Sequence, residues 1–179
     1  MTDDDVPRTE TATPEPAAEP VPFSSAALLA ELLGQQARLV LPRFDYVEGA
    51  RIGGVIAALA EGRGLPVVVR VEAETPAGPH IVFQRAFPGS SPTNDWWIGR
   101  KFAVVRRFGE ASFTVGTRFR VEGTTFEESS GLDEETYAAH GGAFPLRVDG
   151  EIVGIVGVSG LPQQEDHALV VEGLTTYLR

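Results

Sequence analysis

Residues 143–159 read AFPLRVDGEIVGIVGVS and carry the clearest structural signal in the chain. Two runs rich in branched apolar side chains, 143–148 and 152–159, flank the dipeptide Asp149-Gly150. Asp-Gly between such runs favours a tight hairpin, because both central positions of a type I′ turn need a positive φ that these residues tolerate. The stretch therefore predicts two antiparallel strands joined by a short turn.

A second pair of strands is predicted upstream. Residues 67–74 and 80–86 are rich in β-branched side chains, and the Pro and Gly residues of 75–79 separate them. The short segment 38–41 is a further candidate strand. Strands that pair through hairpins form an antiparallel sheet.

Helical periodicity marks four segments before, between and after these strands. Capping signals support them, among them a Ser cap before the first helix, Asp45 with Glu48 before the second and Gly109 after the third. The predicted helices run from Ser24 to Gly34, from Asp45 to Gly62, from Asn94 to Phe108 and from about Pro162 to Leu178. Residues 111–122 are consistent with a helical turn or a strand, and 127–139 with a short helix or a loop. The order of elements predicts an α+β fold with a mainly antiparallel sheet and helices packed on it.

Residues 1–22 differ from the rest in composition. They hold six acids, one base and five prolines with almost no large apolar side chain, which predicts a disordered acidic tail. Residues 23–179 are expected to form one domain, since this length suits a single core. The tail carries half of the net charge of −10 and serves either as a solubilising extension or as a docking segment for a partner.

Composition excludes several classes of protein. Without cysteine, the chain has no disulfide, thiolate metal site or cysteine nucleophile, which suits a reducing compartment. A net charge of −10 argues against nucleic-acid binding, which usually needs a basic field. No apolar run approaches the roughly 20 residues of a membrane span. We therefore expect a soluble cytoplasmic protein with no nucleic-acid or membrane partner.

The predicted helix 94–108 presents one unusual side chain. An apolar arc that includes Trp97 and Phe102 runs along it, and Lys101 falls in the middle of this arc, whereas Arg100 falls outside. A buried ammonium needs a partner or loses its proton. Lys101 therefore serves an anionic ligand, a carbonyl substrate or a buried carboxylate, unless its stem packs and its amine reaches the edge of a pocket or a subunit boundary.

Two of the three histidines occupy positions that suit a site. His167 lies on the apolar stripe of the last helix, where an imidazole is an iron ligand, a general base or a core side chain bonded to a carbonyl. His140 precedes Gly141-Gly142, whose flexible backbone lets a side chain reach a cleft. The sequence contains no HExxH motif, nucleophile elbow or phosphate-binding glycine loop.

The stretch 140–167, HGGAFPLRVDGEIVGIVGVSGLPQQEDH, resembles the C-terminal signature of the GlcG/HbpS-like family, also called the haem-degrading domain family. Residues 94–101, NDWWIGRK, together with 159–167, are similar to its small, functionally uncharacterised branch. The resemblance covers roughly residues 45–178. It implies a profilin-like α+β sandwich that assembles into a homo-oligomer, and haem as the ligand to be bound or degraded.

Two functions follow as hypotheses. In the first, the protein binds haem or another small ligand in a pocket lined by Trp97, Arg100, Lys101, His140 and His167, with His140 and His167 as candidate iron ligands. In the second, it is a non-catalytic oligomeric adaptor for protein partners, since the sequence shows no complete catalytic constellation.

Overall fold

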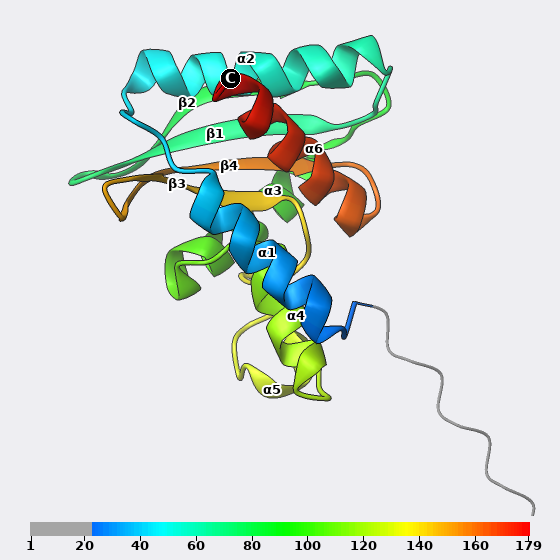
Figure 1. Ribbon diagram of the computed structural model, residues 1–179. Helices are drawn as coiled ribbons and strands as arrows, with labels where there is room; N and C mark the ends of the chain where they lie inside the picture. Colours follow the sequence, from blue (N-terminus) through cyan, green and yellow to red (C-terminus); the bar gives the residue numbers. More distant parts are fainter. Residues whose placement is uncertain (1–22) are drawn as a thin grey trace, which may run out of the picture.

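A four-stranded antiparallel sheet in the order β2-β1-β4-β3 forms the centre of the structure. The computed structural model describes residues 23–179 (Figure 1), so the predicted disordered tail lies outside the described residues. The strands are β1 (Val68–Thr75), β2 (Gly78–Ala86), β3 (Ala143–Val148) and β4 (Glu151–Ser159). Both predicted hairpins are confirmed, and the pairing of β1 with β4 joins them into one sheet.

Helices cover both faces of this sheet. Figure 1 shows α2 and α6 on one face and α3 on the other, while α1, α4 and α5 pack together beyond β3. The helices are α1 (Ala26–Arg38), α2 (Tyr46–Gly62), α3 (Pro92–Phe108), α4 (Ser112–Val121), α5 (Phe126–Ser129) and α6 (Gln163–Tyr177). The expected α+β architecture is confirmed. Among residues 23–179, no helix combines the length and the apolar content that crossing a bilayer requires.

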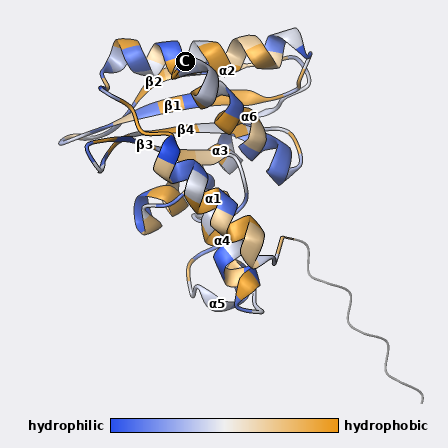
Figure 2. Ribbon diagram, viewed as in Figure 1, coloured by the Kyte–Doolittle hydropathy of each residue, from blue (hydrophilic) through white to orange (hydrophobic). Residues whose placement is uncertain are grey.

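The central strands are apolar on both faces because both faces are covered. In β1, Val69 and Val71 pack in the core under α2 and α6, whereas Val68 packs with Phe102 under α3. Alternate side chains of a strand point to opposite faces, so this single run contributes to two cores. Figure 2 shows hydrophilic and hydrophobic bands along the helices, as expected for amphipathic helices that cover a sheet.

The predicted helix boundaries are set by local caps. The Asp45 carboxylate accepts a hydrogen bond from the Glu48 amide at 2.8 Å, which satisfies one free N–H at the start of α2. At α3, Ser91 and Asn94 form a capping box, and Gly109 ends the helix with φ 72°, a conformation that favours glycine. Both helices therefore begin and end within two residues of the predicted positions.

The first helix is longer than predicted and the strand predicted at 38–41 is wrong. Instead of ending at Gly34, α1 continues to Arg38 because Gln35 and Gln36 in its last turns bond to other elements. Residues 39–41 form a connection without strand pairing. The Leu39 amide donates to the Gln35 carbonyl at the end of α1, and the Leu41 amide donates to the Arg147 carbonyl. Tertiary contacts thus override the weak local cost of a glycine in a helix.

The two ambiguous segments are also resolved. Residues 112–121 form α4, most of which is buried, so helix rather than strand is the outcome. Beyond the short helix α5, residues 130–142 form an irregular connection that ends in the His140 loop, residues 138–142. This loop returns the chain to β3 beside α3 and α6.

Candidate functional site

A cavity of about 260 Å³ lies where α3, the His140 loop and the start of α6 meet. We call it the α3–α6 pocket. Its lining is mixed in chemistry, with an indole, an imidazole, an amine, a carboxylate and two amides. The lining residues are Asn94, Trp97, Lys101, His140, Ser159, Gly160, Leu161, Gln163 and Asp166. Three of the five predicted site residues, Trp97, Lys101 and His140, are thereby brought together.

Lys101 and Asp166 form a buried ion pair in the lining of the pocket. Lys101 is 3% exposed and Asp166 is 1% exposed. The Lys101 ammonium donates to Oδ2 of Asp166 at 2.9 Å and to the carbonyl oxygen of Val158 at 3.2 Å. Among the alternatives for Lys101, the buried carboxylate is the one that the structure shows.

The carboxylate of Asp166 also organises the backbone beside it. Its Oδ1 accepts a hydrogen bond from the Leu161 amide at 3.0 Å, which holds the turn that leads from β4 into α6. The carboxylate therefore has a partner on each oxygen. A buried charge needs this kind of satisfaction to be tolerated.

Burial and pairing act in opposite directions on the two charges. Burial lowers the pKa of Lys101 and raises the pKa of Asp166, because desolvation disfavours both charged forms. Their mutual attraction and hydrogen bond oppose both shifts. The proton between them is consequently held less firmly by the amine than on an exposed lysine.

Glycine in the His140 loop allows the loop to close over this pair. Gly142 has φ 124°, and a Cβ there would overlap the Val158 carbonyl oxygen and lie 2.8 Å from Nζ of Lys101. At Gly141, a Cβ would overlap the carbonyl oxygen of Gln163. Both glycines are therefore needed for the close approach of backbone to α6 and β4.

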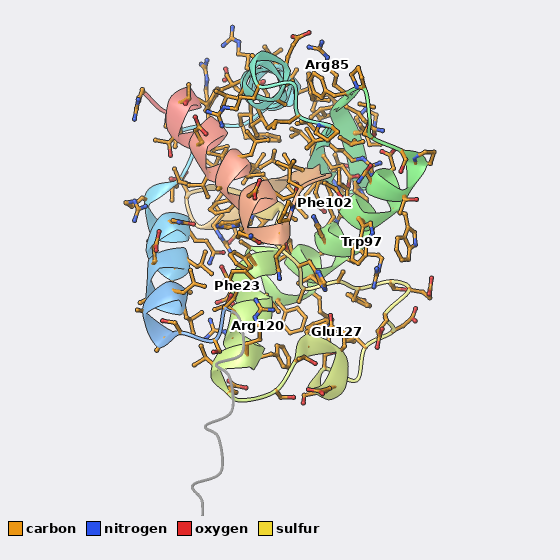
Figure 3. The ribbon with its side chains drawn as sticks, turned by 90° about the vertical axis from the view of Figure 1, so that its right-hand side faces the viewer. Phe23, Arg85, Trp97, Phe102, Arg120 and Glu127 are labelled. Carbon is orange, nitrogen blue, oxygen red and sulfur yellow. The ribbon has the colours of Figure 1, made fainter. Side chains whose placement is uncertain are left out.

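His140 lies on the open side of the pocket. Its side chain is 42% exposed, its ring centroid lies 5.3 Å from that of Trp97, and its Nε2 lies 3.4 Å from Oε1 of Glu127. Burial lowers its pKa, which Glu127 partly opposes. Figure 3 shows Trp97 and Glu127, the two neighbours of His140, on the same side of the molecule. His140 is thus a neutral, accessible imidazole beside an indole at neutral pH.

Arg100 is buried, contrary to the helical-arc prediction that placed it outside the apolar face. It is 9% exposed, and its guanidinium carbon lies 4.2 Å from the ring centroid of Trp96 and 4.5 Å from that of Trp97. It also donates to the Tyr137 carbonyl, while its Nε has no hydrogen-bond partner among the described residues. The two adjacent tryptophans, rather than the helical arc, cover this cation.

His167 occupies a different place from the other predicted site residues. It lines a second cavity of about 330 Å³ between α1, α4 and α6, and its Nε2 lies 2.8 Å from Oε1 of Gln35. The ring lies close to Phe113 and Phe144, and burial lowers its pKa to about 4. Its Nδ1 is buried without a hydrogen-bond partner among residues 23–179. His140 and His167 therefore line separate cavities.

The described side chains do not form a metal-binding site. Within the described part of the chain, no three side chains of the His, Asp and Glu types are grouped as ligands of a metal ion would be. The His140 side chain is a single imidazole that is open on one side. The chemistry available at the pocket is binding through aromatic walls, one imidazole and a paired amine.

Sequence reasoning missed Asp166 and Gln163. Asp166 belongs to the same Glu-Asp-His run as His167, and its position one residue earlier on α6 turns it toward α3 instead of α1. Gln163 accepts from the Gly141 amide at 3.3 Å and so ties the loop to the helix start. An available signal was the lysine itself, since a buried lysine implies a carboxylate elsewhere.

Comparison with known proteins agrees with the fold and the signature residues. A profile described as haem degrading protein HbpS-like matches residues 44–175. The chain belongs to the HbpS-like family. A UPF0303 protein of Streptomyces avermitilis is 52% identical over 149 residues, which cover 83% of this chain and 89% of the relative. The name of this relative states no activity, in line with the uncharacterised branch of the family.

Several solved structures share the fold of this chain. The crystal structure of Ybr137w protein matches with a TM-score of 0.73 and 32% identity, over 83% of this chain and 87% of that one. The crystal structure of a PduOC:heme complex matches with a TM-score of 0.59 and 16% identity, over 74% and 93%. At this lower identity the likeness concerns the fold alone.

Proposed function

We propose that this HbpS-like protein binds a small ligand at the α3–α6 pocket. We propose haem as this ligand, bound at the mouth of the pocket. The observation that carries the proposal is the open imidazole of His140, which stands against the Trp97 indole above a buried Lys101–Asp166 pair. Concave sites with aromatic walls and a few placed polar groups are typical of ligand-binding proteins.

The residues present fit haem on the mouth of the pocket rather than inside it. The volume of about 260 Å³ is below the range of ordinary ligand pockets, roughly 300–1,000 Å³, and does not enclose a macrocycle. An accessible neutral imidazole, by contrast, is a common haem ligand. The description of the family as haem degrading and the similar fold of the PduOC:heme complex support the same choice of ligand.

The proposal assigns a role to each residue at the mouth. His140 would hold the iron, Trp97 would contact the face of the macrocycle, and Arg100 would fix the orientation of Trp97 from behind. Lys101 would contribute to the polar floor, since its charge is already balanced by Asp166. Haem, when bound, would supply a redox-active iron centre. His167 would have a structural role, because its cavity is a separate one.

The test is a haemin titration followed by Soret absorption, repeated with His140→Ala, His167→Ala and His80→Ala. His80→Ala is the matched control because that imidazole is exposed and stacks on Tyr46, away from the pocket lining. We expect a saturable, stoichiometric spectrum that only His140→Ala abolishes. A Trp97→Ala variant should weaken haemin binding without removing the Soret shift.

Non-saturating binding that none of the variants alters would overturn the haem proposal. The second candidate function, an oligomeric adaptor for protein partners, would then be favoured. It rests on the exposed face of Trp96 beside Trp97, because exposed aromatic side chains are enriched at interfaces. Under the adaptor hypothesis, Trp97→Ala dissociates the assembly while the histidine variants keep it.

Self-assembly and cellular location belong to the same proposal. We propose a homo-oligomer in the cytoplasm, as the family resemblance and the absence of cysteine suggest. Light scattering of the purified protein measures the assembly. A monomer at micromolar concentration would contradict it.

A further inference from the structure

The chain contains fifteen lysine and arginine residues, and Lys101 is the only lysine among them. The two residue types are not equivalent. An arginine guanidinium stays protonated under all ordinary conditions, whereas burial lowers the pKa of a lysine amine, and the deprotonated amine is a nucleophile. The only side-chain primary amine of this protein is therefore a buried one, since Lys101 is 3% exposed.

The Lys101 amine lies in the lining of a pocket and not on the surface, as expected for a reactive group. Lys101 and Asp166 both line the α3–α6 pocket, so a ligand that enters the pocket meets the pair. Asp166 stands 2.9 Å from the amine, within reach of its proton. Val158 provides a further acceptor at 3.2 Å and fixes the direction of Nζ.

The pair supplies both components of a condensation with a carbonyl compound. Transfer of one proton from the ammonium to the carboxylate gives a neutral amine and a neutral acid, and desolvation favours both neutral forms. An ion pair in water would resist this transfer, because solvation stabilises both charges. Here Lys101 is 3% exposed and Asp166 is 1% exposed, so that resistance is reduced.

We propose that Lys101 is a reactive amine that forms an imine with a small aldehyde or ketone bound in the α3–α6 pocket. The inference rests on the proposed function only in requiring that this pocket admits a ligand, and it does not depend on haem. It names the class of substrate for the floor of the pocket.

The step balances without any further reactant. The neutral amine of Lys101 attacks the carbonyl carbon, and a proton moves from nitrogen to oxygen to give a carbinolamine. Protonated Asp166 then donates its proton to the departing hydroxyl group, which leaves as water. The products are one water, a protonated imine on Lys101 and the Asp166 carboxylate, which is the counter-ion of the positive imine at the distance of the original ion pair.

The pocket also restricts the carbonyl compound. Its volume of about 260 Å³ suits a molecule of a few heavy atoms. Asn94, Ser159 and Gln163 contribute amide and hydroxyl groups to the lining, which favours a hydroxylated compound over an alkyl one. We therefore choose glyceraldehyde as the probe and butyraldehyde, which has no hydroxyl group, as its comparison.

The experiment exploits the single lysine. The full chain is incubated with glyceraldehyde and sodium cyanoborohydride, which reduces an imine to a stable secondary amine, and adducts are counted by intact mass and located by peptide mapping. The chain then has two candidate amines, Lys101 and the terminal α-amine. We expect one adduct at Lys101, formed at least about ten-fold faster than at the α-amine, whose lower pKa otherwise makes it the more reactive amine.

Two controls keep the test independent of variant folding. Lys101→Arg keeps the charge opposite Asp166 but forms no imine, so it should lose the adduct. In wild-type chain unfolded in urea, the preference for Lys101 over the α-amine should disappear. Butyraldehyde should label Lys101 more slowly than glyceraldehyde does.

Adducts confined to the α-amine of the native chain, or labelling of Lys101 only after unfolding, would overturn the inference. These outcomes are separate from those of the haemin titration. If the chain binds haemin through His140 but Lys101 stays unlabelled, the imine inference is overturned and the haem proposal stands. If Lys101 is labelled but the chain does not bind haemin, the imine inference stands and the haem proposal is overturned.

Discussion

The Nζ atom of Lys101 in α3 lies 2.9 Å from Oδ2 of Asp166 in α6, although 65 residues separate the two in the chain. The two helices cover opposite faces of the sheet, and the ion pair joins them at the end of the inner strand β4. It thereby fixes the floor of the α3–α6 pocket and the turn that begins α6.

Replacement of one member of this pair should be strongly destabilising. Asp166→Asn and Lys101→Met each leave one buried charge without its opposite charge. For each variant we expect a loss of about 3–5 kcal/mol in the free energy of unfolding. The double variant Lys101→Met/Asp166→Leu should lose much less, since no unpaired charge remains. Urea unfolding followed by circular dichroism measures all three.

Arg63→Ala, which breaks an exposed pair with Glu172, serves as the control and should have a far smaller effect. Equal losses in the single and double variants would contradict the account.

The double glycine before β3 should be sensitive at its second position. Gly142→Ala introduces a Cβ against the Val158 carbonyl oxygen at φ 124°, and we expect a loss of about 2–3 kcal/mol. Gly150→Ala has a comparable φ of 90° with open space around it, so it isolates the cost of the backbone conformation. Denaturant midpoints of the two variants should differ, with Gly142→Ala the less stable. Similar midpoints would show that the close approach to Lys101 carries no cost.

Two neighbouring glycines of α2 should respond with opposite signs. A Cβ at Gly53 would overlap the Phe83 ring of β2, so Gly53→Ala should destabilise the protein by about 1–3 kcal/mol through overpacking. Gly54 has no atom within 4 Å of such a Cβ, and Gly54→Ala should stabilise the helix by up to about 1 kcal/mol. Thermal unfolding of the two variants provides the comparison. A stabilising Gly53→Ala would mean that α2 can move away from the sheet.

Acidic pH should destabilise the protein through His167. Burial lowers the pKa of this imidazole to about 4, against about 6.5 in an unfolded chain. The unfolded state therefore binds a proton that the folded state refuses, and stability falls as the pH drops from about 6.5 to about 4, by about 3 kcal/mol in all.

Urea unfolding of wild type and His167→Gln at pH 7 and pH 4.5 isolates this contribution. The loss between the two pH values should be smaller in His167→Gln than in wild type. The exposed His80→Gln variant should behave like wild type. An unchanged pH dependence in His167→Gln would show that other groups cause the acid sensitivity.

Most of the fold was predictable because its signals are local. The Asp149-Gly150 turn, the cap at Asp45 and the terminal Gly109 act over a few residues, and the structure confirms the elements that they delimit. Local signals failed where distant contacts prevail. The extension of α1 beyond Gly34 depends on the bonds of Gln35 and Gln36 to α6 and α4.

The candidate site was predictable only in part for the same reason. Helical periodicity placed Lys101 on a buried face, but no periodicity names its partner, because the partner lies on another helix. Helical position also left Arg100 outside the apolar arc, whereas the rings of Trp96 and Trp97 cover it.

The sequence by itself determined the four strands of the sheet and most of the helices, that the sheet is antiparallel, and that Lys101 faces inward. Only the tertiary structure decided that Asp166 balances Lys101 and that His140 and His167 line separate cavities. Local hydrogen bonds and side-chain periodicity depend on residues a few positions apart, and a sequence displays these directly. Which helix faces meet depends on how the elements pack across the sheet, and that arrangement is set by the whole core at once.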